Sequence, residues 1–372
     1  MAVSIEQFEI IVLASLTAVA CALPGTFLVL RRVALMSDAI SHAILLGIVL
    51  AFFVTKNLSS PFLVISAAGV GILTVSLTEL LINTQKLKKD AAIGLVFPFL
   101  FSIGVILINL YTSDVHIDSD CVLFGEIAFA PFNRFVVAGK DLGVQGIWMM
   151  GGICLLNVLF ISLFYKELKI ATFDAGLAKT LGFRPNLIHY GLMLLVSITS
   201  VGSFESVGSI LVVALMIAPP CAAYLLTDRL SRMLIFAAGI GVLSAVLGYL
   251  FAYILDASIA GSMATVSGIL FLIVLIFAPE KGLLTRYVIN RWQRLDFGTQ
   301  TLAVHLLQAE LSHSEDTELV VSHMNNHMLW NDEYTSQIIA QGIEQGLIRK
   351  EGNKLMLTPL GREKAKVSIS KD

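Results

Sequence analysis

An aspartate and a histidine lie four residues apart at 38–42, inside an otherwise apolar stretch. Residues four apart on a helix share one face, so Asp38 and His42 can present a carboxylate oxygen and an imidazole nitrogen to one ion. Divalent transition metals accept both ligand types. An Asp in lipid costs about 2.5–3.5 kcal/mol, which a bound cation would offset. The alternative is a structural Asp38 that accepts hydrogen bonds from Ser37, Ser41 or a neighbouring helix.

The elements that must position this pair are long apolar stretches. The chain has 372 residues, of which 56% are hydrophobic and 14% charged, whereas soluble domains carry about 25% charged residues. Stretches long enough to span a bilayer occur at about residues 8–30, 34–54, 61–83, 91–111, 145–165, 187–203, 207–227, 233–255 and 262–279. The stretch at 187–203 is near the lower length limit, so it is either a span or a re-entrant element. We therefore expect an all-α polytopic membrane protein with eight or nine transmembrane helices.

The distribution of basic residues predicts the orientation. If all nine stretches cross, alternate loops on one side carry Arg31, Arg32, Lys86, Lys88, Lys89, Lys166, Lys169, Lys179, Arg184, Arg229, Arg232, Lys281 and Arg286. The other side carries only Lys56, Arg134 and Lys140. Because Lys and Arg concentrate in cytosolic loops, we expect the N-terminus outside and the C-terminus in the cytosol.

Other ionisable residues have weaker claims to chemistry. Glu205 and Asp256 fall in short external turns between apolar stretches, where each could line an entrance for cations. Glu79 is expected to reach the cytosolic interface, and Asp90 to cap the fourth helix. The external loop 112–144 carries Asp114, His116, Asp118, Asp120 and Glu126. A solvated charged surface explains this loop, although it would also attract cations.

The cytosolic loop 166–187 contains a short amphipathic pattern. Asp174 can cap a helix that Gly182 and Pro185 end. This helix is too short to cross a membrane and too apolar to lie free in solvent. It suits docking into a groove on a soluble partner, and the alternative is an interfacial helix on lipid.

Several motifs, in order and spacing, resemble the permease subunit of bacterial ATP-binding-cassette (ABC) importers for manganese, zinc or iron. The similarity covers about residues 8–280, and its motifs are 28–32 (LVLRR), 38–43 (DAISHA), 90–94 (DAAIG), 173–182 (FDAGLAKTLG) and 207–219 (VGSILVVALMIAP). The family usually has a Pro-Ser-Gly turn after the position of Asp256, whereas this chain reads ASIAG at 257–261. The shape of that outer turn therefore does not follow from the resemblance.

This resemblance implies a transport subunit rather than an enzyme, located in the bacterial cell (inner) membrane. Asp38 and His42 would be metal-path residues for a transported Mn, Zn or Fe ion, with no permanently bound cofactor. A cassette ATPase would dock on Phe173, Asp174, Ala175, Gly176, Leu177, Ala178, Leu181 and Gly182. A second permease subunit, identical or not, and an extracytoplasmic solute-binding protein would complete the importer. The chain has no GxxxxGK[ST] loop, so another polypeptide must hydrolyse ATP.

The chain turns polar after Pro279, which predicts two domains, a transmembrane domain at 1–285 and a cytosolic domain at 295–372. Helical patterns at 299–311, 316–329 and 333–346 precede a hairpin signal around Gly352 and Asn353. Three helices and a hairpin predict a small α+β winged-helix-like domain. Its ending at 357–365 (LTPLGREKA) resembles iron- and manganese-dependent repressors. The expected apolar core is Leu302, Leu306, Val320, Met324, Ile338, Ile343 and Leu347.

The charge of this domain disfavours DNA binding. From Asn290 onward, nine Lys and Arg residues face eleven Asp and Glu residues, whereas DNA-binding domains usually carry a basic footprint. The helix pattern at 333–346 contains no Lys or Arg. We therefore expect a regulatory or docking role. His323 and His327, four residues apart, are either a metal-sensing pair or solvent-facing side chains.

Two alternatives to an ATP-driven importer remain. An ion-coupled secondary metal carrier would need no nucleotide partner, and inverted repeats with broken helices would favour it. A metal-responsive, membrane-tethered transcription regulator would read DNA through the C-terminal domain. The docking pattern at 173–182 disfavours the carrier, and the acidity of the C-terminal domain disfavours the regulator.

Overall fold

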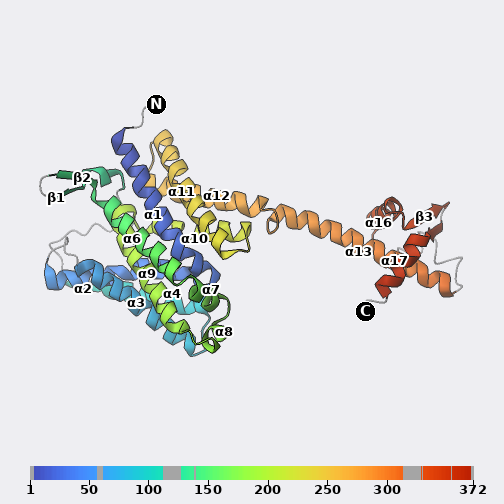
Figure 1. The fold of residues 1–372 in the computed structure, drawn as a ribbon, viewed down its shortest axis with the longest axis horizontal. Helices are drawn as coiled ribbons and strands as arrows, with labels where there is room; N and C mark the ends of the chain where they lie inside the picture. Colours follow the sequence, from blue (N-terminus) through green and yellow to red (C-terminus); the bar gives the residue numbers. More distant parts are fainter. Residues whose placement is uncertain are drawn as a thin grey trace. The chain divides into compact units, whose positions relative to one another are not determined.

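The computed structural model describes residues 4–56, 62–111, 127–137, 140–312, 328, 330–352 and 354–369. The chain forms two units by its contacts, Met1–Pro279 and Glu280–Asp372. Both are mainly helical (Figure 1). The first unit carries the apolar stretches, and the second carries the polar C-terminal segment.

Nine helices within the described residues are long and apolar enough to span a membrane. They are α1 (Ile5–Leu30), α2 (Leu35–Thr55), α3 (Phe62–Asn83), α4 (Lys89–Tyr111), α6 (Gln145–Leu163), α9 (Pro185–Val207), α10 (Ser209–Leu226), α11 (Leu230–Leu255) and α12 (Ile259–Phe277). Between α6 and α9 lie two short helices, α7 (Tyr165–Phe173) and α8 (Ala175–Thr180).

Helix α9 settles the doubtful stretch at 187–203. It is one continuous helix of 23 residues that begins with Pro185, whose ring suits the first helical turn. It ends at Gly208, which has φ +79°, a conformation that glycine adopts without steric cost. The stretch is therefore a full-length helix, which favours nine spans over eight.

The described part of the loop between α4 and α6 has regular structure. It forms the 3-10 helix η1 (Ile127–Phe132) and an antiparallel hairpin of β1 (Arg134–Val137) and β2 (Lys140–Val144). The residues from Asp114 to Glu126 on which a charged entrance was considered lie outside the described residues.

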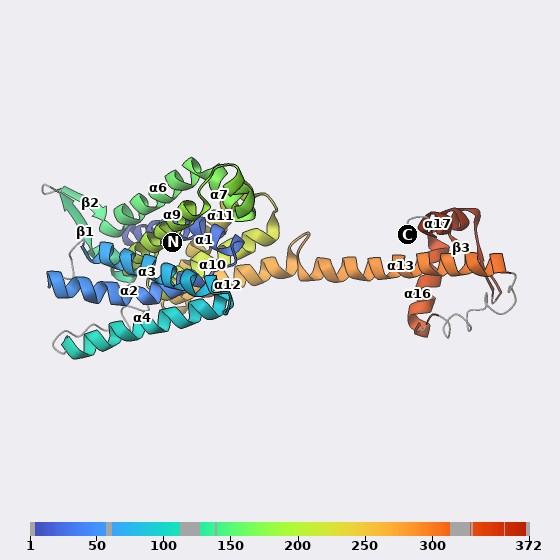
Figure 2. The same ribbon diagram turned by 90° about the horizontal axis from the view of Figure 1, so that it is seen from below.

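Helix α1 packs against α6, α9, α10 and α11, and α2 packs against α3 and α4. The latter three helices lie side by side along one flank of the unit (Figure 2). Close approach of α2 and α3 depends on Gly47, because a Cβ at this position would lie 2.6 Å from Cα of Ala67. The Ser66 hydroxyl also donates to the Gly47 carbonyl at 2.8 Å. This crossing holds α2, which carries Asp38 and His42, against its neighbour.

The second unit contains α13 (Leu283–Ser312), α16 (Asp332–Glu344), the hairpin β3 (Ile348–Glu351) and β4 (Lys354–Leu357), and α17 (Pro359–Ile369). The predicted hairpin is confirmed, with Ile348 opposite Leu357. The helix expected at 299–311 is wrong at its start, because α13 begins at Leu283. The pattern at 316–329 lies outside the described residues, and so do His323 and His327.

The core of this unit matches the expectation at four positions and differs at one. Leu302, Leu306, Ile338 and Leu347 are buried, together with Leu355 and Leu357 from the hairpin. Ile343 is 45% exposed, because it lies on the face of α16 turned away from this core. Val320 and Met324 lie outside the described residues.

Candidate metal path and partner-docking segment

The paired carboxylate and imidazole lie in the first two turns of α2. Nε2 of His42 lies 3.4 Å from Oδ1 of Asp38. The His42 ring is stacked with Phe97 of α4, with ring centroids 5.7 Å apart, and meets Phe101 edge-on at 6.1 Å. The spacing expected for one shared helix face is therefore realised, and two aromatic rings fix the orientation of the imidazole.

The two neighbouring serines do not bind Asp38. The Ser37 hydroxyl donates to the Ala34 carbonyl at 2.8 Å, and the Ser41 hydroxyl donates to the Ser37 carbonyl at 2.9 Å. Both serines are buried. Neither serine hydroxyl therefore supplies the hydrogen bond that a purely structural role of Asp38 would require from it.

Asp38 and His42 remain partly open, with side chains 36% and 32% exposed. Among the described residues, no group of three or more His, Cys, Asp and Glu side chains could hold a metal ion. The pair supplies one oxygen and one nitrogen ligand, and a divalent metal bound here needs further ligands from water or another chain.

The segment at 173–182 has the predicted local structure. Asp174 is the N-cap of α8, and its Oδ1 accepts a hydrogen bond from the Leu177 backbone N–H at 2.9 Å. Gly182 follows with φ +85°, and Pro185 begins α9. Phe173 and Ala175 lie at the adjoining ends of α7 and α8, with Asp174 between them.

Apolar side chains of this segment face solvent. Phe173, Leu177 and Leu181 are 61%, 49% and 56% exposed, whereas Ala178 is fully buried. Gly176 and Gly182 have no side chains, so they do not cover these exposed apolar groups. Exposed apolar side chains next to a rigid turn form a surface suited to a partner.

The two residues expected in external turns, Glu205 and Asp256, differ in their backbone positions. The expectation that Glu205 lies in a turn is wrong, because α9 continues through this residue to Val207. Asp256 does end α11, in a left-handed conformation with φ +51°. It lines a cavity of about 430 Å³ together with Tyr249 and Phe129.

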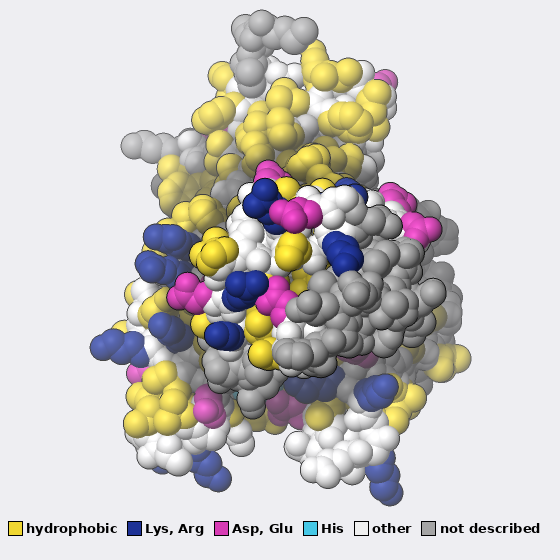
Figure 3. Space-filling view, turned by 90° about the vertical axis from the view of Figure 1, so that its right-hand side faces the viewer, with side chains coloured by type: hydrophobic (Ala, Val, Ile, Leu, Met, Phe, Trp, Pro, Cys, Tyr) yellow, Lys and Arg dark blue, Asp and Glu magenta, His cyan; other side chains and the backbone are white. Residues whose placement is uncertain are grey.

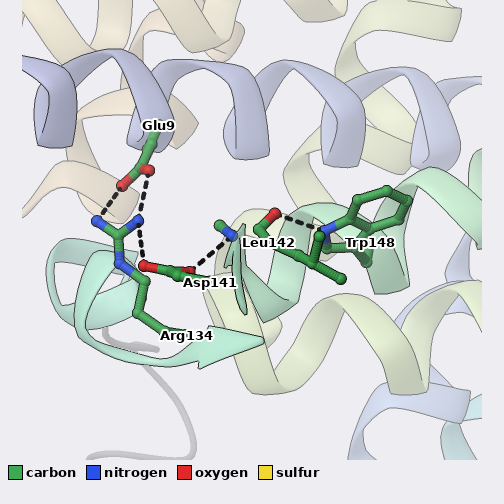
Figure 4. A network of polar contacts seen from close by, with 6 residues as sticks. Glu9, Arg134, Asp141, Leu142 and Trp148 are labelled. Carbon is green, nitrogen blue, oxygen red and sulfur yellow. Dashed lines mark hydrogen bonds and ion pairs between the residues drawn. The ribbon is translucent and has the colours of Figure 1, made fainter. Parts of the chain in front are cut away.

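Figure 4 shows a polar network that ties the β1–β2 hairpin to the start of α1. Arg134 donates to both carboxylate oxygens of Glu9, at 3.0 and 3.2 Å, and its Nη1 lies 3.5 Å from Asp141. Asp141 accepts from the Gly143 N–H, and the Trp148 indole N–H donates to the Leu142 carbonyl. The hairpin is thereby fixed on the bundle end where α1 begins.

A polar cluster that sequence reasoning missed lies at the opposite end of α1. Glu79 of α3 contacts His189 of α9, so its carboxylate pairs with a side chain of another helix. Arg31 also contacts His189. An ionisable residue within an apolar stretch was the available signal, but its partners come from helices far apart in sequence. Asp90 does not cap α4, because it is the second residue of that helix.

Nine candidate membrane helices among the described residues, one of them carrying the Asp38–His42 pair, are typical of a polytopic transport protein, and comparisons give its family. The model of the ABC 3 transport family matches residues 7–278. The zinc transport system membrane protein TroD of Treponema pallidum is 44% identical over 353 residues, covering 95% of this chain and 96% of that protein. The manganese transport system membrane protein MntD of Bacillus subtilis is 50% identical over 282 residues, covering 75% of this chain and 95% of that protein.

A solved structure gives the same result. PsaBC from Streptococcus pneumoniae, in complex with Fab, matches with a TM-score of 0.62 and 29% identity, covering 75% of this chain and 94% of that one. The chain belongs to the ABC 3 transport family. It is the membrane permease component of an ABC transporter.

Proposed function

We propose that this permease imports a divalent transition-metal ion, Mn, Zn or Fe, across the bacterial cell membrane, with ATP hydrolysed by a separate cassette ATPase. The observation that carries the proposal is the Asp38–His42 pair, 3.4 Å apart on one face of α2. The relatives named as zinc and manganese transport proteins support the choice of cargo. One carboxylate and one imidazole suit all three metals.

A second permease subunit completes this site. The pair supplies two ligands and is about one-third exposed, and an uncovered Asp facing lipid would be costly. A matching pair from a partner permease, identical or related, would supply two more ligands. Two carboxylates and two imidazoles would then surround the ion.

The segment at 173–182 is the docking surface for the cassette ATPase. The exposed side chains of Phe173, Leu177 and Leu181 supply its apolar contacts, while the Asp174 cap and Gly182 fix its shape. The Lys and Arg residues in the loops on the same side of the membrane support a cytosolic location for this segment and for the C-terminal unit. The N-terminus and the β1–β2 hairpin then face outward, where a solute-binding protein delivers the ion.

Membership of an ABC transport family argues against the ion-coupled secondary carrier. The family match at 7–278 also gives the spans a transport role, which argues against a membrane-tethered regulator.

For the C-terminal unit we propose a regulatory or docking role in a winged-helix-like fold. Figure 3 shows Lys and Arg side chains among Asp and Glu side chains on one face of the molecule. The chain from Asn290 onward carries nine Lys and Arg residues and eleven Asp and Glu residues, which gives little attraction for phosphates.

The test is uptake by vesicles that contain the permease pair and the ATPase, with the solute-binding protein and radioactive manganese, zinc or iron outside. ATP inside the vesicles is expected to drive accumulation of at least one of the three ions. A non-hydrolysable ATP analogue is the matched control. Equal uptake with ATP and with the analogue would contradict an ATP-driven importer.

A further inference from the structure

Four residues form a continuous polar chain where α1 ends and α2 begins. The Arg31 Nε donates to the Thr172 hydroxyl at 3.2 Å, and its Nη1 lies 2.9 Å from Nδ1 of His189. Nε2 of His189 contacts Oε1 of Glu79. Thr172 belongs to α7, His189 to α9 and Glu79 to α3, so the chain joins three helices through the residue that follows α1.

The donor and the acceptor in the Arg31–His189 hydrogen bond can be assigned. A guanidinium can only donate hydrogen bonds, so Nδ1 of His189 must accept the bond from Arg31. The ring therefore carries its proton on Nε2, the atom that contacts the Glu79 carboxylate, although this N–H is not aligned for a hydrogen bond with it. His189 acts as a neutral bridge between a cation and an anion that do not touch each other.

Arg31 is partly buried but keeps its charge. Burial lowers the pKa of its guanidinium to about 10, and the nearby Glu79 carboxylate partly opposes this shift. It is therefore protonated at neutral pH. Within the part of the chain that the structure describes, its Nη2 is buried without a hydrogen-bond partner. Arg31, Thr172 and Lys89 line a cavity of about 350 Å³, which gives the guanidinium space to move.

We propose that Arg31 is a positioning residue that couples the ATPase-docking segment to the membrane helices. Thr172 directly precedes Phe173, the first residue of that segment. When the docked ATPase displaces this segment, Arg31 moves with Thr172 and releases His189. This weakens the hold of α9 on Glu79 and the end of α3, where Tyr190 of α9 is a further partner of Glu79. Helix α3 packs against α2, which carries Asp38 and His42. The inference rests on the proposed docking of an ATPase at 173–182.

Substitution of His189 separates this role from the alternatives. His189→Gln keeps the bridge, because an amide oxygen can accept from Arg31 while the amide nitrogen donates to Glu79. His189→Leu removes the hydrogen bond with Arg31 and the contact with Glu79 at similar side-chain size. Thr172→Val removes only the link between Arg31 and α7, and Asn83→Ala, at the exposed end of α3, is a matched control.

The measurement is ATP hydrolysed per ion imported, in vesicles that contain the permease, the ATPase and the solute-binding protein. The probe is whichever of manganese, zinc or iron the wild type imports. His189→Leu and Thr172→Val are expected to raise this ratio about tenfold or more, since each loses a hydrogen bond to a charged group. His189→Gln and Asn83→Ala are expected to stay near the wild-type ratio, and co-purification of the ATPase is unchanged in all four.

Two results would overturn the inference. If both His189→Leu and Thr172→Val hydrolyse as much ATP per imported ion as the wild type, the contacts among Thr172, Arg31, His189 and Glu79 do not couple the ATPase to transport. A His189→Gln variant as impaired as His189→Leu would show that the ring itself is needed, as a ligand or proton carrier. The docking proposal fails by a different result. In that case, variants altered at 173–182 would still co-purify with the ATPase and would still couple ATP hydrolysis to ion uptake.

Discussion

At the scale of residues, the geometry of the Asp38–His42 pair depends on how closely α2 can approach its neighbours. Gly47 lies one to two turns beyond His42 and meets the backbone of α3 at Ala67. The Phe97 and Phe101 rings hold the imidazole from α4. A change in the α2–α3 crossing would therefore move the pair relative to the aromatic rings.

Gly47→Ala is expected to destabilise the permease, because its Cβ would overlap Ala67 and overpacking costs about 1–3 kcal/mol. The midpoint of thermal unfolding in detergent measures this change and should fall by several degrees. Gly69→Ala in α3 is the matched control, since a Cβ at Gly69 meets nothing within 4 Å. An unfolding midpoint for Gly47→Ala equal to that of Gly69→Ala would refute the close approach.

Individual roles could be predicted from the sequence where the physics is local. Asp174 as a helix cap is confirmed, because capping needs only a backbone N–H three residues ahead. The Glu79–His189–Arg31 cluster could not be predicted, because it depends on which helices pack together. Glu205 was misplaced for a related reason, since a polar residue at the end of an apolar stretch does not show where the helix stops.

At the scale of elements, α7 and α8 form a rigid unit that presents apolar side chains. The Asp174 cap begins α8, and the left-handed Gly182 ends the segment. The same local signals revealed the β3–β4 hairpin. They failed for α13, whose first half mixes exposed apolar side chains with basic ones, so that hydropathy does not show where the helix begins.

Reversing the charge of Asp174 tests the docking unit. Asp174→Lys removes the acceptor for the Leu177 N–H and is expected to cost about 1 kcal/mol of helix stability, together with most of the ATPase co-purification. Asp174→Asn is the matched control, because an Asn oxygen also caps helices and should keep the complex. Gly182→Val should behave like Asp174→Lys, since a β-branched residue is strained at φ +85°. If Asp174→Lys and Gly182→Val both assemble fully with the ATPase and keep metal-stimulated ATPase activity, the segment is a helix on the lipid surface and not a docking site.

At the scale of the whole molecule, the membrane unit and the C-terminal unit are separable. The Bacillus subtilis relative matches over 95% of its own length but only 75% of this chain. That relative therefore has little sequence left for a counterpart of the C-terminal unit. The membrane unit also closes its own contacts at Pro279.

Deletion of residues 283–372 is expected to leave a permease with at least about half of wild-type uptake, because the deletion removes neither the ligand pair nor the docking segment. ATP-driven ion uptake at matched expression measures this.

The isolated segment 283–372 has its own apolar core and is expected to bind duplex DNA weakly even at low salt, because its net charge is negative. Nanomolar, sequence-selective binding would instead make the chain a permease fused to a DNA-binding regulator.

The most direct test of the account is metal uptake by Asp38→Asn and His42→Ala, with both permease subunits substituted and expression matched. Each variant loses a direct ligand, so uptake is expected to fall by more than the about 10–100-fold that loss of a ligand's supporting partner costs. Membrane insertion should persist, because removing an intramembrane charge does not hinder it. Glu6→Gln, a matched loss of charge at the exposed start of α1, should transport normally. Wild-type uptake in both Asp38→Asn and His42→Ala would contradict the assignment of this pair as the metal path.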